Sequence, residues 1–195
     1  MIIAALLLLA AQQPVNDPAE DSTFSERQPV RLAAMPAARA FAAFRDICMT
    51  NFPDPAAFDS AAAASDLGFT RAANPERGAQ EWTSGHGQII FRMATGRDEN
   101  ARRDRREGRT MRRRWLARCD FWVAIEENLE APALVGRIGA ELLGGRARAN
   151  EEIVGTSWDL GATPGGALKL VYLPSNDDPR LFTLSLQLLP EGPAP

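Results

Sequence analysis

The segment from Trp115 to Glu126 constrains the fold of this chain most strongly. It reads W-L-A-R-C-D-F-W-V-A-I-E, and every second position from Cys119 to Ile125 is apolar. A two-residue period that is rich in aromatic and β-branched side chains predicts a strand with one buried face. We expect this strand, over residues 117–125, to lie at the centre of the fold.

The N-terminal residues 1–11 are apolar throughout and are followed by the polar sequence Q-Q-P. An apolar run of about ten residues is too short to cross a bilayer, which takes about 20, and it is typical of a secretory signal peptide. We therefore expect cleavage near residue 12 and a periplasmic or secreted protein without a transmembrane helix in the mature chain. A buried N-terminal strand or helix is the alternative.

Residues 12–35 are predicted to be a disordered lead and 190–195 a tail.

An amphipathic helix is predicted over residues 36–50, because its apolar side chains recur at three- and four-residue steps and form one stripe. The stripe consists of Phe41, Phe44, Ile47 and Cys48. Cys48 and Cys119 are the two cysteines of the chain, and both face the core in this interpretation. In an exported protein they favour a disulfide, which closes a loop of about 70 residues and stabilises by about 4 kcal/mol. Two free buried thiols are the alternative.

Residues 36–189 are predicted to form a single α+β domain. Further helices are predicted over 54–66, where Asp54 is a good N-cap and Pro55 suits the first helical position, and over 132–143. Strands are predicted over 80–83, 88–93, 117–125, 153–160, 168–173 and 181–189, with a short candidate at 69–73 and a loop at 146–152. We expect two layers, a mostly antiparallel sheet of about six strands with about three helices on one face.

The order helix–strand–strand–strand occurs twice in this prediction, and the first strand of each set carries a tryptophan. The pattern indicates an αβββ duplication. Three separate helices that pack on one sheet face explain it without duplication.

Residues 97–114 are dense in arginine, although the whole chain has a net charge of −3. Such a loop attracts polyanions by counterion release, and the guanidinium fork binds phosphates and carboxylates bidentately. The candidate anion-binding residues are Arg102, Arg103, Arg105 and Arg106. In the envelope their partner would be a lipid headgroup, a lipopolysaccharide phosphate or an acidic protein, and not nucleic acid. Because acidic residues are interspersed, a solvated loop that pairs its own charges is the alternative.

The sequence offers few groups for catalysis. His86 is the single histidine, lies between glycines in a predicted turn, and would have to serve any Ser–His–Asp or Cys–His arrangement. Two distant cysteines and one histidine do not have metal-ligand spacing, and no phosphate- or dinucleotide-binding motif occurs. We therefore expect no metal and no cofactor, and His86 is interpreted as a turn residue.

Two carboxylate pairs are weaker candidates. Glu126 and Glu127, at the end of the central strand, form a candidate acid–base pair, with solvated charge at a strand end as the alternative. Asp177 and Asp178 form a candidate cation site in the turn S-N-D-D-P, for which turn chemistry is the simpler explanation.

Three tryptophans on predicted strands are candidates for lining a ligand groove. They are Trp82, Trp122 and Trp158. Core packing is the favoured alternative for them.

Several short segments resemble those of small exported proteins of alphaproteobacteria that carry a signal peptide and one cysteine pair. They are F-x-x-F-R-D-I-C-M at 41–49, L-G-F at 67–69, C-D-F-W-V at 119–123 and T-S-W-D-L at 156–160. The resemblance implies export and the cysteine pair, and it carries no activity.

The leading functional hypothesis is a non-catalytic exported binding or interaction module. Its partner would be an envelope protein or an anionic envelope component. An envelope hydrolase that uses carboxylates and a purely structural periplasmic protein are the alternatives.

Overall fold

The computed structural model describes residues 32–73, 75, 78–94 and 115–190, all within one unit of the chain, 31–195. The helical elements of this part are α1 (Ala37–Phe44), the π-helical turn η1 (Arg45–Met49), α2 (Pro55–Ala64) and α4 (Ala131–Leu143). The strands are β1 (Thr70–Arg71), β2 (Ala79–Thr83), β3 (Gly87–Met93), β4 (Ala117–Ala124), β5 (Ala149–Glu152), β6 (Gly155–Thr163), β7 (Gly166–Pro174) and β8 (Leu181–Leu189). The predicted α+β class is confirmed.

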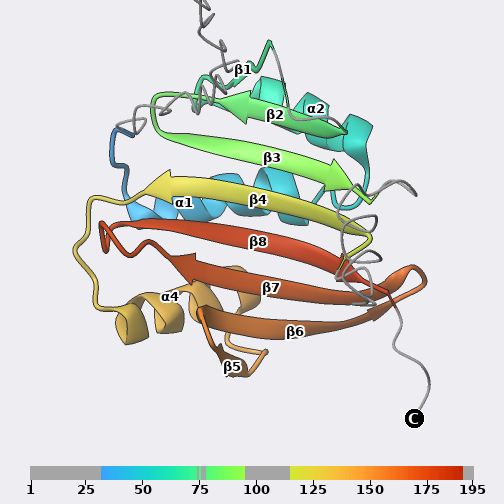
Figure 1. Cartoon of the computed structure of the whole chain (residues 1–195). Helices are drawn as coiled ribbons and strands as arrows, with labels where there is room; N and C mark the ends of the chain where they lie inside the picture. Colours follow the sequence, from blue (N-terminus) through green and yellow to red (C-terminus); the bar gives the residue numbers. More distant parts are fainter. Residues whose placement is uncertain (1–31, 74, 76–77, 95–114, 191–195) are drawn as a thin grey trace, which may run out of the picture. The chain divides into compact units, whose positions relative to one another are not determined.

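All eight strands form one antiparallel sheet in the order β1-β2-β3-β4-β8-β7-β6-β5, which Figure 1 shows face on. Each half of the sheet is a four-stranded meander, and the last strand of each meander, β4 or β8, pairs with the other in the middle. A helix precedes each meander, α2 in the first half and α4 in the second. The repeated order is therefore αββββ, one strand longer in each half than the αβββ predicted from the sequence.

The expectation of about six strands was wrong because of the two edge strands. β1 has two residues, and β5 lies in the segment 146–152 that was expected to be a loop. Every residue of β5 is exposed. An edge strand with no buried face needs no apolar alternation, so the sequence A-N-E-E has no strand pattern.

The predicted start of the next strand at residue 153 was also wrong. Ile153 and Val154 form the tip of the β5–β6 hairpin, and they are 103% and 62% exposed. β6 begins at Gly155, whose φ is +132° and where a Cβ would lie 2.1 Å from the carbonyl oxygen of Tyr172. A glycine is required there because both the backbone angle and the close approach exclude a side chain.

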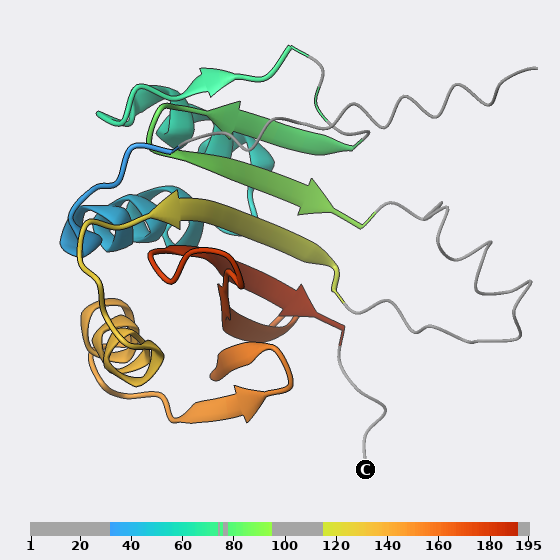
Figure 2. The ribbon, with the colours of Figure 1, turned by 60° about the vertical axis from the view of Figure 1, so that its left-hand side comes forward.

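The described helices pack on one face of the sheet, as the turned view shows (Figure 2). The predicted helix over 36–50 is confirmed as α1 followed by η1. The Asn51 side chain ends it by donating to the carbonyl oxygens of Asp46, at 2.7 Å, and Ile47, at 3.2 Å. Asp54 caps α2 as predicted, because its Oδ1 accepts from the N–H of Ala56 at 2.8 Å.

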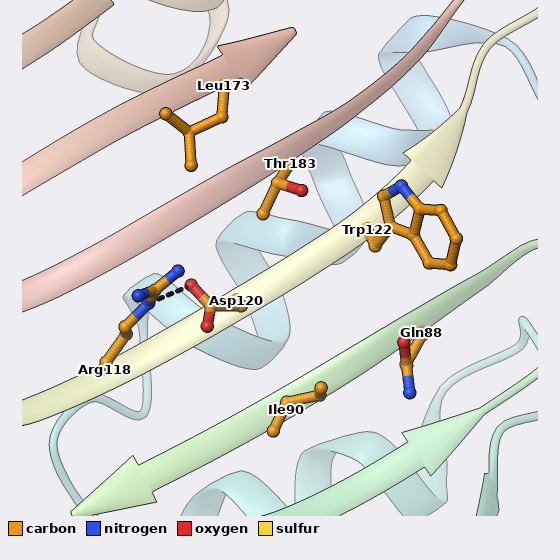
Figure 3. A pocket seen from close by; sticks show the side chains of 7 residues that line it. All are labelled: Gln88, Ile90, Arg118, Asp120, Trp122, Leu173 and Thr183. Carbon is orange, nitrogen blue, oxygen red and sulfur yellow. Dashed lines mark hydrogen bonds and ion pairs between the residues drawn. The ribbon is translucent and has the colours of Figure 1, made fainter. Parts of the chain in front are cut away.

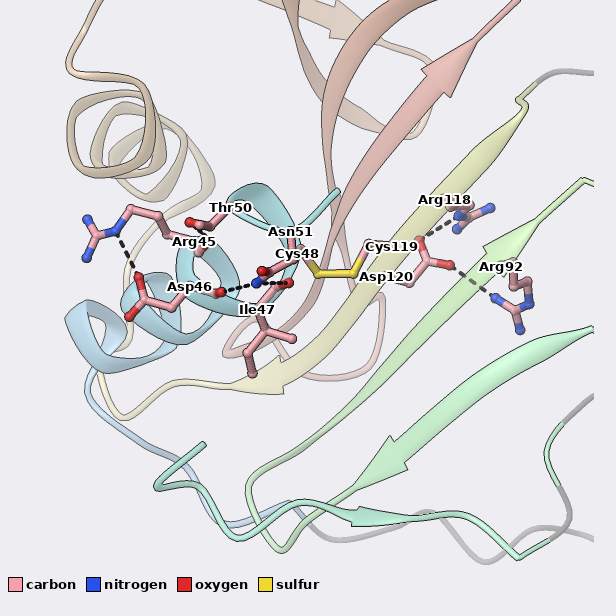
Figure 4. Close-up of a disulfide and its surroundings, with 10 residues drawn as sticks. All are labelled: Arg45, Asp46, Ile47, Cys48, Thr50, Asn51, Arg92, Arg118, Cys119 and Asp120. Atoms are coloured by element: carbon pink, nitrogen blue, oxygen red, sulfur yellow. Dashed lines mark hydrogen bonds and ion pairs between the residues drawn. A yellow bond between two sulfur atoms is a disulfide. The ribbon is translucent and has the colours of Figure 1, made fainter. Parts of the chain in front are cut away.

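The predicted disulfide is present between Cys48 and Cys119, whose Cα atoms are 5.9 Å apart (Figure 4). Both cysteines are buried, and the bond joins the helical layer to the central strand β4. The ring of Phe44 stacks on that of Phe121 nearby, with 6.5 Å between centroids. The centre of the core is therefore held by a covalent link and by aromatic packing at the same place.

The folded segment begins upstream of residue 36. Met35 is buried and forms a parallel bridge with Ile125: its N–H donates to Ala124 at 3.1 Å, and its carbonyl accepts from Glu126 at 2.9 Å. Residues 32–35, which were expected to belong to the disordered lead, are thus part of the domain. The expected signal peptide, the rest of that lead, Arg102, Arg103, Arg105 and Arg106, and residues 191–195 lie outside the described residues.

Among the described helices, none has the length and apolar character needed to span a membrane.

Candidate functional site

Alternate residues of β4 lie on opposite sides of the sheet. Cys119, Phe121 and Val123 face the helices and are fully buried. Arg118 and Trp122 lie on the other side, which no described helix covers (Figure 2). We call this side the open face.

The open face carries a depression of about 240 Å³ that spans four adjacent strands, β3, β4, β8 and β7 (Figure 3). We call it the Trp122 depression. Its lining combines apolar and polar side chains, namely Gln88, Ile90, Arg118, Asp120, Trp122, Leu173 and Thr183. Strand register explains the grouping, because Gln88 pairs with Trp122, Trp122 with Thr183, and Thr183 with Leu173. These four residues form one row across the sheet.

A buried carboxylate pairs with two arginines at one end of this depression. Asp120 is 7% exposed, and its two oxygens accept from Arg118 Nε at 2.5 Å and from Arg92 Nη1 at 3.2 Å. Figure 4 shows this cluster on the side of β4 opposite the disulfide. A buried charge requires such partners, and the guanidinium groups of Arg118 and Arg92 supply them here.

Arg118 has hydrogen-bond donors that no described residue uses. Asp120 occupies its Nε, and neither of its Nη groups has a partner among the residues that the structure describes. The Asp120 contact fixes the guanidinium plane, so the two Nη groups form a preset pair of donors. Such a fork suits a carboxylate or phosphate. Sequence reasoning named Trp122 as a candidate groove residue but neither Arg118 nor Asp120, although an aspartate inside the apolar run C-D-F-W-V was a usable signal.

Glu127 of the candidate acid–base pair has a structural role. Its Oε2 accepts from the N–H of Ala37, the first residue of α1, at 2.9 Å, and its Oε1 accepts from Arg137 Nη1 at 2.9 Å. Burial alone raises the pKa of Glu127, but the Arg137 hydrogen bond, the backbone N–H groups of Ala37 and Glu127, and the Arg137 charge bring it below its ordinary 4.5. A general acid at neutral pH needs the opposite shift. The partner residue, Glu126, is exposed.

The second carboxylate pair is explained by its turn. Asp178 accepts from the backbone N–H of Arg180 at 2.9 Å and from the guanidinium of Arg180, whose hydrogen bonds lower the pKa of Asp178. Asp177 is exposed. Within the described ranges, no three His, Cys, Asp or Glu side chains gather in a way that would hold a metal ion.

The three candidate tryptophans do not line one groove. Trp158 is buried on the helix side, and Trp82 lies on the same side with its Nε1 donating to Asp59 of α2 at 2.9 Å. Trp122 lies on the open face instead. His86 is in the β2–β3 turn, where its Nδ1 lies 3.0 Å from the carbonyl oxygen of Ala33.

The structure therefore defines an α+β protein with a disulfide-linked core and one sheet face without a described helix. No protein-family model, no curated protein and no solved structure matches the chain.

Proposed function

We propose that the chain is a non-catalytic binding module of the bacterial envelope whose partner binds at the open face. The observation that carries the proposal is the Trp122 depression, where an aromatic ring and an oriented arginine fork lie together. Tryptophan and arginine are the residue types that most often dominate the energy of protein interfaces.

The size and lining of the depression favour a protein partner. Its volume of about 240 Å³ is below the roughly 300–1,000 Å³ of a small-molecule pocket, and it suits one or two inserted side chains. Ile90, Trp122 and Leu173 offer apolar contact, and Arg118 offers a charge-assisted hydrogen bond. The partner we propose is an envelope protein that presents an apolar side chain next to an acidic one.

Two features support the proposed compartment. The apolar residues 1–11 have the length of a signal-peptide core. The Cys48–Cys119 disulfide is of the kind that persists in oxidising compartments such as the periplasm. We therefore propose a periplasmic or secreted protein.

Capture from a periplasmic extract tests the binding proposal. The purified mature protein, a Trp122→Ala variant and a Gln187→Ala variant serve as baits; Gln187 is on the same face but outside the depression. Wild type and Gln187→Ala should retain the same protein, and Trp122→Ala should lose it. Equal capture by all three baits contradicts the proposal.

The arginines of the segment 97–114 remain a second proposed contact, with an anionic envelope component. Replacing Arg102, Arg103, Arg105 and Arg106 with Gln should weaken binding to anionic vesicles, most strongly at low salt. Wild-type binding that ignores salt, or a variant that binds equally well, would show that this segment is only a solvated connection.

A further inference from the structure

A second depression, of about 340 Å³, lies where the segment between β4 and α4 meets the end of β7 and the β7–β8 turn. It is separate from the Trp122 depression and shares no lining residue with it. We call it the Tyr172 depression. The residues on which the argument depends are Leu129, Glu130, Ala131, Tyr172, Pro174 and Pro179.

Tyr172 places a hydroxyl without a described protein partner at this depression. It is the single tyrosine of the chain and is 3% exposed, and its ring packs on Phe182 with 5.6 Å between centroids. Its hydroxyl has no hydrogen-bond partner among the described residues, and the side chain lines the depression. The hydroxyl is not fully enclosed, because the fully buried side-chain atom without a partner in the described part of the chain is Gln80 Oε1. A ligand that enters the depression can therefore reach the hydroxyl of Tyr172.

The first turn of α4 adds a second donor. Ala131 is the first residue of this 13-residue helix, and the preceding Glu130 makes no side-chain cap. The N–H of Ala131 accordingly has no partner among the described residues. Free N–H groups and the helix dipole favour an electron-rich oxygen at this end. Ala131 and Tyr172 line the same depression, and their donors would together suit a carbonyl or carboxylate oxygen.

The remaining lining is acidic at one place and apolar elsewhere. The carboxylate of Glu130 has no hydrogen-bond or ion-pair partner in the described part of the chain, and it lines the same depression. An ammonium group is its natural complement. Leu129, Pro174 and Pro179 provide apolar contact.

We propose that the Tyr172 depression binds an α-amino carbonyl group with an apolar side chain. The carbonyl or carboxylate oxygen accepts from Tyr172 and from the N–H of Ala131, and the ammonium pairs with Glu130. A free amino acid and the N-terminal residue of a peptide share this chemistry. A volume near 340 Å³ is at the small end of the range for ligand pockets, roughly 300–1,000 Å³, and suits one such residue.

The single tyrosine makes the test direct, because protein labelled with ¹³C-tyrosine gives one set of ring signals. Three probes are added at millimolar concentration: L-leucine, L-leucylglycine amide, and N-acetyl-L-leucine, which lacks the ammonium. We expect the Tyr172 signals to shift with leucine, with leucylglycine amide, or with both, and to stay with N-acetyl-leucine. A response to leucine alone identifies a free amino acid, and a response to the amide includes peptide N-termini. No response to either, or an equal response to N-acetyl-leucine, overturns the proposal.

Two variants separate binding from folding. Tyr172→Phe keeps the ring packing, so it should leave the melting temperature unchanged while weakening calorimetric binding of the active probe about fivefold to tenfold. Glu130→Gln should weaken the same probe, and Trp122→Ala should not. Unchanged affinity of Tyr172→Phe for the probe contradicts a ligand role for the hydroxyl. So does a lower melting temperature of the variant, if partial unfolding accounts for its weaker binding.

Discussion

The two sides of β4 differ in what they contact, although their residues alternate along one strand. On the helix side, Cys119 is bonded to Cys48 and Phe121 stacks on Phe44. On the open face, Asp120 holds Arg118 and Arg92, and Trp122 lines a depression. We therefore expect substitutions on the helix side to change stability, and substitutions on the open face to change the proposed binding. The predictions below test that separation from the largest expected effect on stability to the smallest.

Removing the disulfide should have the largest effect. A variant with both Cys48→Ala and Cys119→Ala should lose about 4 kcal/mol of unfolding free energy, because the cross-link spans a sequence separation of 71. Urea unfolding of the variant and the oxidised wild type measures the loss. Far-UV circular dichroism should stay native-like, since the apolar core remains. A loss below about 1 kcal/mol would show that the cross-link contributes little.

Two neighbours on β8 provide a matched comparison of the two faces. Leu184 is fully buried and faces the helices, and Thr183 borders the Trp122 depression. Leu184→Ala should cost about 3 kcal/mol because it leaves a cavity, and Thr183→Ala at most about 1 kcal/mol. The urea midpoints of the two variants give both losses of stability, provided that the unfolding free energy depends on urea with the same slope in each. Similar costs for the two variants would remove the proposed division between the faces.

Replacing Glu127 should have a smaller effect that depends on pH. Glu127→Gln weakens the contacts to Ala37 and Arg137 and should cost about 1 kcal/mol at pH 7. The folded pKa of Glu127 lies below the unfolded value, so its contribution is present above about 4.5 and is lost as the pH falls through the folded pKa. We would measure urea unfolding of wild type and Glu127→Gln at pH 7 and near pH 3. Their unfolding free energies should differ less near pH 3 than at pH 7. Glu126→Gln is the control and should leave the unfolding free energy almost unchanged. A difference between wild type and Glu127→Gln that grows in acid would contradict the stabilising role assigned to the ionised Glu127.

The sequence was sufficient for the covered side of the fold and insufficient for the edges and the sites. Periodicity located β4 and the stripe containing Cys48, because burial on one side imposes a repeat. It missed β5, which has no buried face, and it misplaced Ile153 and Val154, whose β-branched side chains are typical of a strand but lie at a hairpin tip.

The two depressions required the structure, because each joins residues that are distant in sequence. Trp122 and Leu173 belong to strands β4 and β7, which are brought together by the pairing of both with β8. Tyr172 and Glu130 line the same depression only after β7 and the start of α4 are placed. Hydrophobic alternation determines which face of the sheet a side chain takes, but it does not say which strand of the other half becomes the neighbour.

The smallest effect on stability is expected for Trp122→Ala. Because Trp122 is only partly buried and makes no hydrogen bond among the described residues, its loss should cost less than about 1 kcal/mol. The same variant should lose the captured envelope partner. A large destabilisation with intact capture would reverse the roles that we assign to the two faces.

The most direct test is ¹⁹F NMR of the protein labelled with 5-fluorotryptophan, recorded before and after adding a periplasmic extract. Its four tryptophans give separate probes, which single Trp→Phe variants assign. The account predicts that the Trp122 signal shifts or broadens, while the signals of Trp82 and Trp158 on the helix side stay in place. An unchanged Trp122 signal, or equal changes at Trp158, would contradict binding at the open face.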